Sequence, residues 1–251
     1  MKTLVSIITP SYNSINFIRS TYDSLSQQTY SNWEWLVTDD CSTDETFTLL
    51  QELMKKDSRI KLFKNKVNSG AAVTRNVSLE HAKGDFIAFL DSDDLWYSDK
   101  LEKQVSFMGD QINFSFTAYE LIDAENVKVG KTVDTKQKGS FNYQNQLRKK
   151  ATMGCSTVML RRSAFNDIKM PLIRTRQDYA LWLKLLKTGE SAVILNEILT
   201  QYRILPDSIS RNKIKAAQKT WFVYREIEKL SFFSACISFI FYAWRGVFKT
   251  Q

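Results

Sequence analysis

Acidic side chains follow two apolar segments in the N-terminal half of this 251-residue chain. Asp91 and Asp93 flank Ser92 directly after the apolar run Phe86–Leu90, and Asp39 ends an earlier run. Carboxylates at this spacing suit a hard divalent cation such as Mg²⁺ or Mn²⁺, which keeps coordination positions open for substrate phosphates. The alternative is that these aspartates are solvated turn residues or helix caps.

Three further residues could take part in chemistry. Asp40 would face the other acids, so an ordinary turn role would leave like charges together with no cation to relieve them. Arg75 follows the segment Asn68-Ser69-Gly70 and is either a charge-assisted partner for a diphosphate or one half of a surface salt bridge. His81 is the chain's single histidine, so histidine-based nucleophilic catalysis is not expected.

The elements that must position these residues alternate between strand and helix. Such repetition predicts an α/β fold, in which a mostly parallel central sheet is flanked by helices on both faces. Ligands of such sheets bind outside the carboxyl ends of the strands, which is where the aspartates lie. The predicted strands are Leu4–Thr9, Trp33–Thr38, Ile60–Lys64 and Phe86–Leu90, and the helices between them span about 14–27, 43–55 and 71–82.

The second half of the chain is less regular. It contains strand-like segments at Phe114–Tyr119, Val127–Val133, Ser156–Leu160, Ala192–Leu195 and Thr200–Arg203, and one clear helix at Asp178–Lys187. Proline and glycine are scarce, with three and eight residues, and no linker rich in them separates the halves. We therefore expect one domain over residues 1–210, with halves 1–100 and 101–210, and a C-terminal helical extension over 211–251.

Charge and cysteine content narrow the function classes. Residues 211–251 carry a net charge of +6 out of +8 for the whole chain, so the body is near neutral and a nucleic-acid partner is not expected. The three cysteines are widely separated, without disulfide or metal spacing, which is typical of a reducing compartment. The apolar N-terminal stretch is too short for a signal peptide, and we expect a cytoplasmic protein. No Walker loop or dinucleotide fingerprint is present, which excludes P-loop kinases and Rossmann dehydrogenases.

The C-terminal extension has the pattern of a helix that lies in a membrane surface. Leu230–Trp244 contains no charged residue and is too short to span a bilayer, which takes about 20 residues. Its apolar positions recur at helical spacing opposite a narrow polar stripe, and basic residues surround it. We expect peripheral binding to the cytoplasmic face of the inner membrane. The alternative is a helix packed on the domain or on a second copy, as in a homodimer. The apolar positions are Phe233, Ile237, Ile240, Phe241, Trp244 and Phe248, and the polar stripe is Ser231, Ser234, Ser238, Tyr242, Arg245 and Lys249.

Four motifs in order resemble those of family 2 glycosyltransferases with the GT-A fold, and in particular bacterial O-antigen and capsule enzymes. The likeness is strong over about residues 3–100 and weaker to about residue 210. The motifs are Pro10-x-Tyr12-Asn13, Thr38-Asp39-Asp40-x-Ser42-Thr43-Asp44, Asn68-x-Gly70-x-x-x-x-Arg75-Asn76 and Phe89-Leu90-Asp91-Ser92-Asp93-Asp94.

The resemblance implies a role for each motif. Asp39 would accept a hydrogen bond from the uracil ring N–H, Asp91 would approach the ribose, and Asp93 would bind the Mn²⁺ or Mg²⁺ that bridges the diphosphate. Residues 1–100 would form the nucleotide-binding half and residues 101–210 the acceptor-binding half. The implied nucleotide-binding set is Pro10, Tyr12, Asp39, Arg75, Asp91 and Ser92.

The resemblance also implies a catalytic carboxylate at the start of a helix. The family usually has a Glu-Asp pair there, and this chain has Gln177-Asp178. We identify Asp178 as the candidate general base, with a helix N-cap as the alternative role. Arg203, followed by Ser208-Ile209-Ser210, is a weaker match to a loop that closes over the donor phosphates.

These assignments predict an inverting, metal-dependent hexosyltransferase. It would move glucose or galactose from a UDP-sugar to a polyprenyl-diphosphate-linked sugar, forming a β-linkage during O-antigen or capsule repeat-unit synthesis. The alternative is a non-catalytic nucleotide-sugar-binding module of an assembly complex, which would not need a carboxylate at position 178. A nucleotidyltransferase is excluded because residues 9–16 lack the glycine- and lysine-rich phosphate loop.

Overall fold

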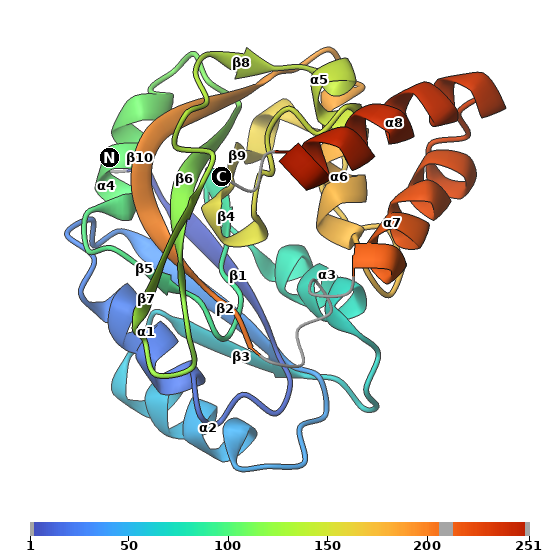
Figure 1. Ribbon diagram of the computed structural model, residues 1–251. Helices are drawn as coiled ribbons and strands as arrows, with labels where there is room; N and C mark the ends of the chain where they lie inside the picture. Colours follow the sequence, from blue (N-terminus) through green and yellow to red (C-terminus); the bar gives the residue numbers. More distant parts are fainter. Residues whose placement is uncertain (1–2, 206–212, 249–251) are drawn as a thin grey trace.

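A parallel sheet in the order β3-β2-β1-β4 organises the N-terminal half of the chain (Figure 1). The computed structural model describes residues 3–205 and 213–248. Strands β1, β2 and β4 are almost entirely buried, as expected for parallel strands covered on both faces. The strands are β1 (Val5–Ser11), β2 (Trp33–Asp39), β3 (Ile60–Lys64) and β4 (Phe86–Phe89).

Three helices connect these strands and cover both faces of the sheet. Helices α1 (Ile18–Ser26) and α2 (Thr46–Lys56) pack on one face, where Ile18 and Leu50 join the core around Trp35. Helix α3 (Ala71–His81) packs on the other face, against the side chains that point the opposite way along the same strands. The predicted alternation of strand and helix is confirmed in this half. Helix α1 begins later than expected, at Ile18, because residues 14–17 form a turn closed on the Ser14 carbonyl.

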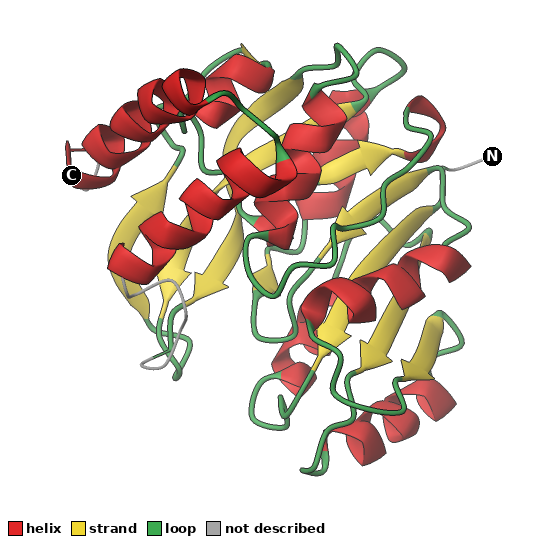
Figure 2. Ribbon diagram, turned by 90° about the vertical axis from the view of Figure 1, so that its right-hand side faces the viewer, coloured by secondary structure: helices red, strands yellow, loops and turns green. Residues whose placement is uncertain are grey.

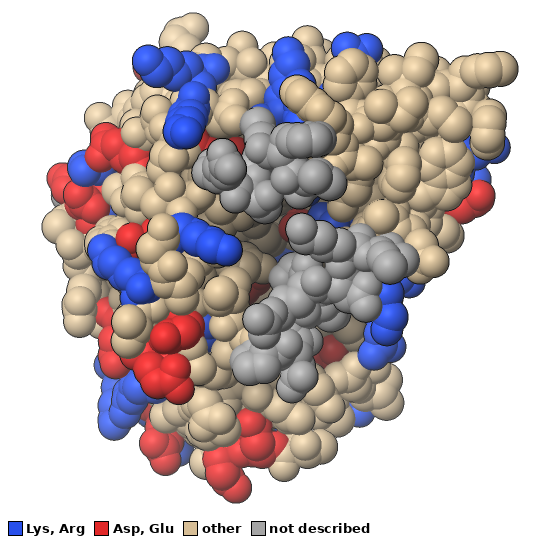
Figure 3. Space-filling model, viewed as in Figure 1, with Lys and Arg blue, Asp and Glu red and all other residues tan. Residues whose placement is uncertain are grey.

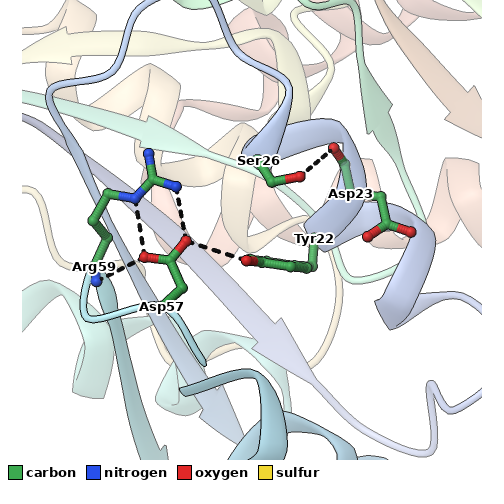
Figure 4. Close-up of polar contacts among 5 residues, drawn as sticks. All are labelled: Tyr22, Asp23, Ser26, Asp57 and Arg59. Carbon is green, nitrogen blue, oxygen red and sulfur yellow. Dashed lines mark hydrogen bonds and ion pairs between the residues drawn. The ribbon is translucent and has the colours of Figure 1, made fainter. Parts of the chain in front are cut away.

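A charged contact ties α1 to the turn that precedes β3 (Figure 4). The Asp57 carboxylate accepts hydrogen bonds from Nε and Nη2 of Arg59, at 3.0 and 2.8 Å, and from the Tyr22 hydroxyl at 3.2 Å. The hydrogen bonds from Arg59 hold the pKa of Asp57 below its usual value. This contact holds α1 against the turn before β3, at the end of the sheet opposite the candidate site.

The second half extends the same sheet in the order β4-β9-β6-β10-β5. Figure 2 shows helices packed along the strands of this sheet. Strand β9 is antiparallel to both β4 and β6, whereas β6 and β10 run parallel. The sheet is therefore parallel in its first half and mixed in its second. The elements are β5 (Leu95–Trp96), α4 (Lys100–Met108), β6 (Phe114–Ile122), β7 (Lys128–Val133), β8 (Ser140–Phe141), α5 (Tyr143–Leu147), β9 (Met159–Arg161), α6 (Gln177–Leu186) and β10 (Ala192–Arg203).

Strand β10 differs from the sequence-based expectation. Two short strands were expected over 192–195 and 200–203, and the structure has one strand over 192–203. Its register against β6 shifts between Leu195 and Thr200, which marks a bulge rather than a break. The predicted pairing of the segments near 114–119 and 127–133 is confirmed by the antiparallel pair β6–β7.

The C-terminal extension is helical and packs on the body. Helix α7 (Lys213–Phe222) leads through a π-helical turn (Val223–Ile227) to α8 (Phe232–Phe248) (Figure 1). These helices contact α5 and α6 through a small apolar core. No helix in the described ranges is long and apolar enough to span a bilayer. The buried members of this core are Leu147, Ala180, Leu183, Val223, Tyr224 and Ala235.

Helix α8 turns its small and polar side inward. Ser238 and Tyr242, members of the predicted polar stripe, are 5% and 9% exposed and lie against the body. Phe233 and Ile240, on the predicted apolar stripe, are 79% and 66% exposed. The prediction of two opposite stripes is confirmed at these four positions. It is wrong at Ser231 and Ser234, which are exposed, and Phe241 is half-buried. The apolar stripe is the one that faces outward.

Candidate active site

The loops that follow β1 and β2 are joined at the carboxyl edge of the sheet. Ser11 and Asp39 are register partners at the ends of the two strands. The Asn13 backbone N–H donates to Ser42 Oγ at 3.0 Å, and Asn13 Oδ1 accepts from the Thr43 N–H at 2.9 Å. The two motifs therefore form one surface, as the parallel topology predicted.

Asp39 has a free acceptor at this surface. Its side chain is buried, and Oδ2 accepts a hydrogen bond from the Ser42 N–H at 2.9 Å. Its Oδ1 is buried and has no hydrogen-bond partner in the described residues. A buried acceptor without a partner costs free energy that a bound N–H group would recover. Tyr12, directly before Asn13, is 48% exposed and leaves its ring available for stacking.

Asp40 has a different environment from the one expected. Instead of facing other acids, it accepts hydrogen bonds from Asn65 Nδ2 at 2.7 Å, the Ser69 N–H at 2.8 Å and the Gly70 N–H at 2.7 Å. Gly70 has a φ of 85°, a left-handed conformation that favours glycine. The expected like-charge repulsion at Asp40 was wrong. Asp40 fastens the end of β2 to the loop that starts α3.

Arg75 and Asp91 form a salt bridge across the same edge. Arg75 is 5% exposed, so the pair is buried rather than the surface salt bridge that was one of its two expected roles. Burial lowers the pKa of Arg75, but the charge and hydrogen bond of Asp91, together with the charges of Cys155 and Asp178, outweigh this effect and raise it. Nε of Arg75 is buried and has no hydrogen-bond partner in the described part of the chain. The guanidinium therefore keeps one donor for an incoming anion.

Asp93 fits a role as a metal ligand. Burial, and then the charge of Asp91, raise the pKa of Asp93 to about 6. A bound cation would relieve both effects. No group of three His, Cys, Asp or Glu side chains forms a complete metal site in the described ranges. One or two carboxylates with substrate phosphates and water are sufficient for Mg²⁺, which matches what this edge offers.

Residues distant in the sequence brace the aspartate turn. Ser156 Oγ accepts from the Asp91 N–H at 3.0 Å and donates to Asp94 Oδ2 at 2.5 Å, while Asp94 Oδ1 accepts from the Arg203 N–H at 2.8 Å. Sequence reasoning missed Ser156, because no local pattern connects it with a turn more than 60 residues earlier. Burial raises the pKa of Asp94, and the neighbouring aspartates add to this.

Arg203 also stabilises the aspartate turn. Its Nε donates to the Asp93 carbonyl at 2.6 Å, and its Nη1 and Nη2 donate to the Asp123 carbonyl and to Asn126 Oδ1, both at 2.6 Å. In this structure the guanidinium is thus engaged by backbone and side chains of its own chain. Its expected contact with donor phosphates stays a prediction. The partner segment Ser208–Ser210 lies outside the described residues.

Asp178 lies in the first turn of α6 and is not its cap. The N-cap is Arg176, and no side-chain capping hydrogen bond is present. The alternative role for Asp178 as an N-cap was therefore wrong. Gln177 Oε1 is buried without a hydrogen-bond partner in the described residues, so this amide oxygen accepts nothing from its surroundings. The Asp178 carboxylate stays available to a ligand.

One cavity connects the two halves of the site. It has a volume of about 340 Å³ and is lined by Asp91 from the nucleotide-binding edge and by Asp178 from α6. The charges of both carboxylates raise the pKa of Arg75, so both act on its guanidinium. Lys149, Arg176 and Tyr242 also line this cavity.

Comparisons with known proteins agree with this arrangement. The sequence model described as Glycosyl transferase family 2 matches residues 6–169. The putative teichuronic acid biosynthesis glycosyltransferase TuaG of Bacillus subtilis is 49% identical over 99% of this chain and 98% of its own length. The UDP-Glc:alpha-D-GlcNAc-diphosphoundecaprenol beta-1,3-glucosyltransferase WfgD of Escherichia coli is 44% identical over 87% of this chain and 84% of its own.

The fold has counterparts among solved structures. The mannosyltransferase PcManGT from Pyrobaculum calidifontis, solved with GDP-Man and Mn²⁺, superposes with a TM-score of 0.73 at 18% identity. The match covers 92% of this chain and 66% of that one. At this identity the likeness establishes a shared fold.

Proposed function

This chain belongs to glycosyl transferase family 2, and from that premise we propose that it transfers a hexose from a UDP-sugar to a lipid-linked sugar acceptor. WfgD acts with UDP-Glc on a GlcNAc-diphosphoundecaprenol, which supports glucose as the hexose and a polyprenyl diphosphate as the acceptor's carrier. The assigned process is synthesis of a bacterial surface polysaccharide such as O-antigen. The observation that carries the proposal is the single cavity lined by both Asp91 and Asp178.

The donor end of the site is assigned to UDP. The unpaired Oδ1 of Asp39 is suited to accept from the uracil ring N–H, and Tyr12 and Pro10 flank it on β1 and its following loop. A cytosine would present an acceptor at the equivalent ring position and would be repelled. Asp91 and Ser92 then adjoin the ribose, and the Nε of Arg75 is a donor for the diphosphate.

The donor diphosphate needs charge neutralisation. Asp93 would hold a divalent cation, Mn²⁺ or Mg²⁺, which supplies a positive charge to the leaving UDP. Two observations support this assignment: the raised pKa of Asp93 and the Mn²⁺ bound to a protein of the same fold.

Asp178 is assigned as the general base. A sugar hydroxyl is a weak nucleophile, so a carboxylate that removes its proton as the C1–O bond breaks lowers the barrier. The hydroxyl oxygen forms the new bond to C1, UDP departs from the opposite face, and the proton passes to Asp178. One such displacement inverts the anomeric centre, so an α-linked donor gives a β-linked product.

The direct test is a donor screen against a synthetic GlcNAc-diphosphate-lipid. We expect transfer from UDP-glucose or UDP-galactose and a β-linkage in the NMR spectrum of the product. The alternative, a non-catalytic nucleotide-sugar-binding module, would bind UDP-sugars but neither transfer nor hydrolyse them in the presence of Mn²⁺. An α-linked product would contradict the single-displacement mechanism.

We also propose that α8 docks the protein on an anionic membrane surface at the cytoplasmic face of the inner membrane. Its outward side presents a row of large apolar side chains, and Figure 3 shows the surface over α8 almost entirely in tan with basic side chains at its margins. Apolar side chains bordered by Lys and Arg are typical of helices that lie in the headgroup region. The outward row is Phe232, Phe233, Ile237, Ile240 and Trp244, which are 50% to 79% exposed.

Vesicle sedimentation tests this docking. We expect the protein to bind vesicles with phosphatidylglycerol more tightly than phosphatidylcholine vesicles, and the double variant Phe233→Ser, Ile240→Ser to lose most of this binding. Met54→Ser is the matched control, because Met54 is 38% exposed and lies on α2, at the opposite end of the molecule from α8 (Figure 1). Unchanged vesicle binding in the double variant would contradict the proposal. Loss of a dimer in that variant, measured by light scattering, would assign the face to a second copy instead.

A further inference from the structure

Two basic side chains converge on one tyrosine of α8 inside the cavity. Arg176 Nη2 donates to the Tyr242 hydroxyl at 3.2 Å, and Lys149 Nζ lies 4.6 Å from the centroid of the Tyr242 ring. Both basic residues line the cavity. No salt bridge to a carboxylate involves either of them in the described part of the chain. Two cations therefore share a partly enclosed space in which neither forms an ion pair with a described residue.

This arrangement is unfavourable unless an anion binds. Burial lowers the pKa of Lys149, and the positive charge of Arg176 acts in the same direction. Asp134 is the acidic group that acts on Lys149, and its carboxylate accepts hydrogen bonds from the backbone N–H groups of Thr152 and Met153. A dianionic ligand would give the two cations the partner that the chain itself does not supply.

The backbone also holds both cations in position. Lys149 and Arg176 have left-handed conformations, with φ of 50° and 65°. Such conformations are uncommon for residues other than glycine, and they cluster at ligand-binding positions. Arg176 is two residues before Asp178, at the start of the same helix. The cations are therefore placed beside the candidate base.

The donor and this second anion are assigned to different side chains. The donor diphosphate is assigned to Arg75 and Asp93, whereas Lys149 and Arg176 are grouped around Tyr242 in the same cavity. The substrate whose hydroxyl must reach Asp178 is the acceptor, and its own anionic group lies one sugar residue away from that hydroxyl. Resting on the proposed function, we infer that Lys149 and Arg176 bind the diphosphate of a prenyl-diphosphate-linked acceptor.

Through Tyr242, α8 would also take part in binding the acceptor. Tyr242 lies on the inward side of α8, and the outward side of the same helix carries the exposed apolar row. A prenyl chain attached to a diphosphate at Tyr242 leads toward the helix assigned to the membrane surface. The acceptor headgroup then enters the cavity while its lipid stays in the bilayer.

Binding of a short prenyl diphosphate tests the site without requiring catalysis. Farnesyl diphosphate is titrated into the full-length protein with Mn²⁺ and saturating UDP, so that the donor site is already filled. We expect binding to wild type, and a tenfold to hundredfold higher Kd in Lys149→Gln and in Arg176→Gln, as for loss of a hydrogen bond to a charged group. Lys131→Gln and Arg174→Gln are matched controls at exposed positions and should bind as wild type does.

Two outcomes would overturn the inference: no binding to wild type, or equal binding by wild type and both variants. A second assay compares GlcNAc-diphosphate-undecyl with the undecyl glycoside of GlcNAc, which lacks the diphosphate. The variants should raise KM for the first acceptor alone, with donor hydrolysis unchanged. An equal loss on both acceptors would assign Lys149 and Arg176 a structural role. Farnesyl diphosphate binding without any sugar transfer would contradict the proposed function and leave the anion site supported.

Discussion

The variant Asp178→Asn should slow the chemical step of transfer while it leaves donor binding and folding almost unchanged. Asparagine keeps the size of the side chain but cannot accept the proton of the acceptor hydroxyl. Loss of a general base lowers the rate by about 10²–10⁴, which is about 2.7–5.4 kcal/mol of transition-state stabilisation. The structure predicts a small effect on stability, because Asp178 makes no capping hydrogen bond. Its favourable position in the first turn of α6 contributes about 0.3–1 kcal/mol.

The assay measures three quantities on the same preparation. Transfer to a GlcNAc-diphosphate-lipid should fall by at least a hundredfold, whereas UDP affinity by calorimetry should stay within a few-fold of wild type. The melting temperature should fall by no more than about 4 °C, the shift that corresponds to 1 kcal/mol in a protein of this size. Asp110→Asn, at an exposed carboxylate after α4, is the matched control. Transfer by Asp178→Asn at a rate close to that of wild type would refute the assignment of the base.

Three other predictions concern the carboxylates of the N-terminal half. Asp39→Asn should weaken UDP binding about tenfold or more, because it removes a charged acceptor for the uracil N–H, and wild type should bind UDP far more tightly than CDP in calorimetry; equal affinities would argue against this role. Removal of metal with EDTA should abolish transfer, Mn²⁺ should restore it, and Asp93→Asn should not recover; full turnover in EDTA would exclude the metal. Asp57→Asn should lower the free energy of unfolding by about 1–2 kcal/mol at pH 7 in urea titrations. Because the pKa of Asp57 is lowered in the folded state, this advantage of wild type should shrink as the pH falls below about 4, and a constant difference down to pH 2 would contradict it.

The strand-helix alternation and the edge that carries the donor site could be predicted from the sequence. Buried parallel strands are recognisable as apolar runs, and the topology of parallel sheets requires their carboxyl ends to coincide. Asp39 and Asp91 were therefore expected at the same edge of the sheet, which the structure confirms. Asp178 came from the family resemblance, and the structure adds that it shares a cavity with Asp91.

Contacts between distant segments could not be predicted in this way. Strand β9 inserts between β4 and β6 and joins the halves into one sheet. A strand was expected close to it, at Ser156–Leu160, but no local pattern predicts its place between β4 and β6 or its antiparallel direction. Ser156 and Arg203 brace the aspartate turn from positions more than 60 residues away. Asp40 has three donors around it because the loop before α3 folds back onto β2, and its charge alone had suggested repulsion.

In helix α8, the sequence determined one feature and the tertiary structure another. Its sequence determined that the apolar and polar residues lie on opposite sides, because side chains recur every 3.6 residues along a helix. Which side of α8 faces the body depended on the residues of the body that the helix packs against. The body offers an apolar core that takes Ala235 and a pair of basic residues that take the Tyr242 ring and hydroxyl. Only the tertiary structure could decide this, because periodicity defines the two sides of a helix but not the surface against which either side packs.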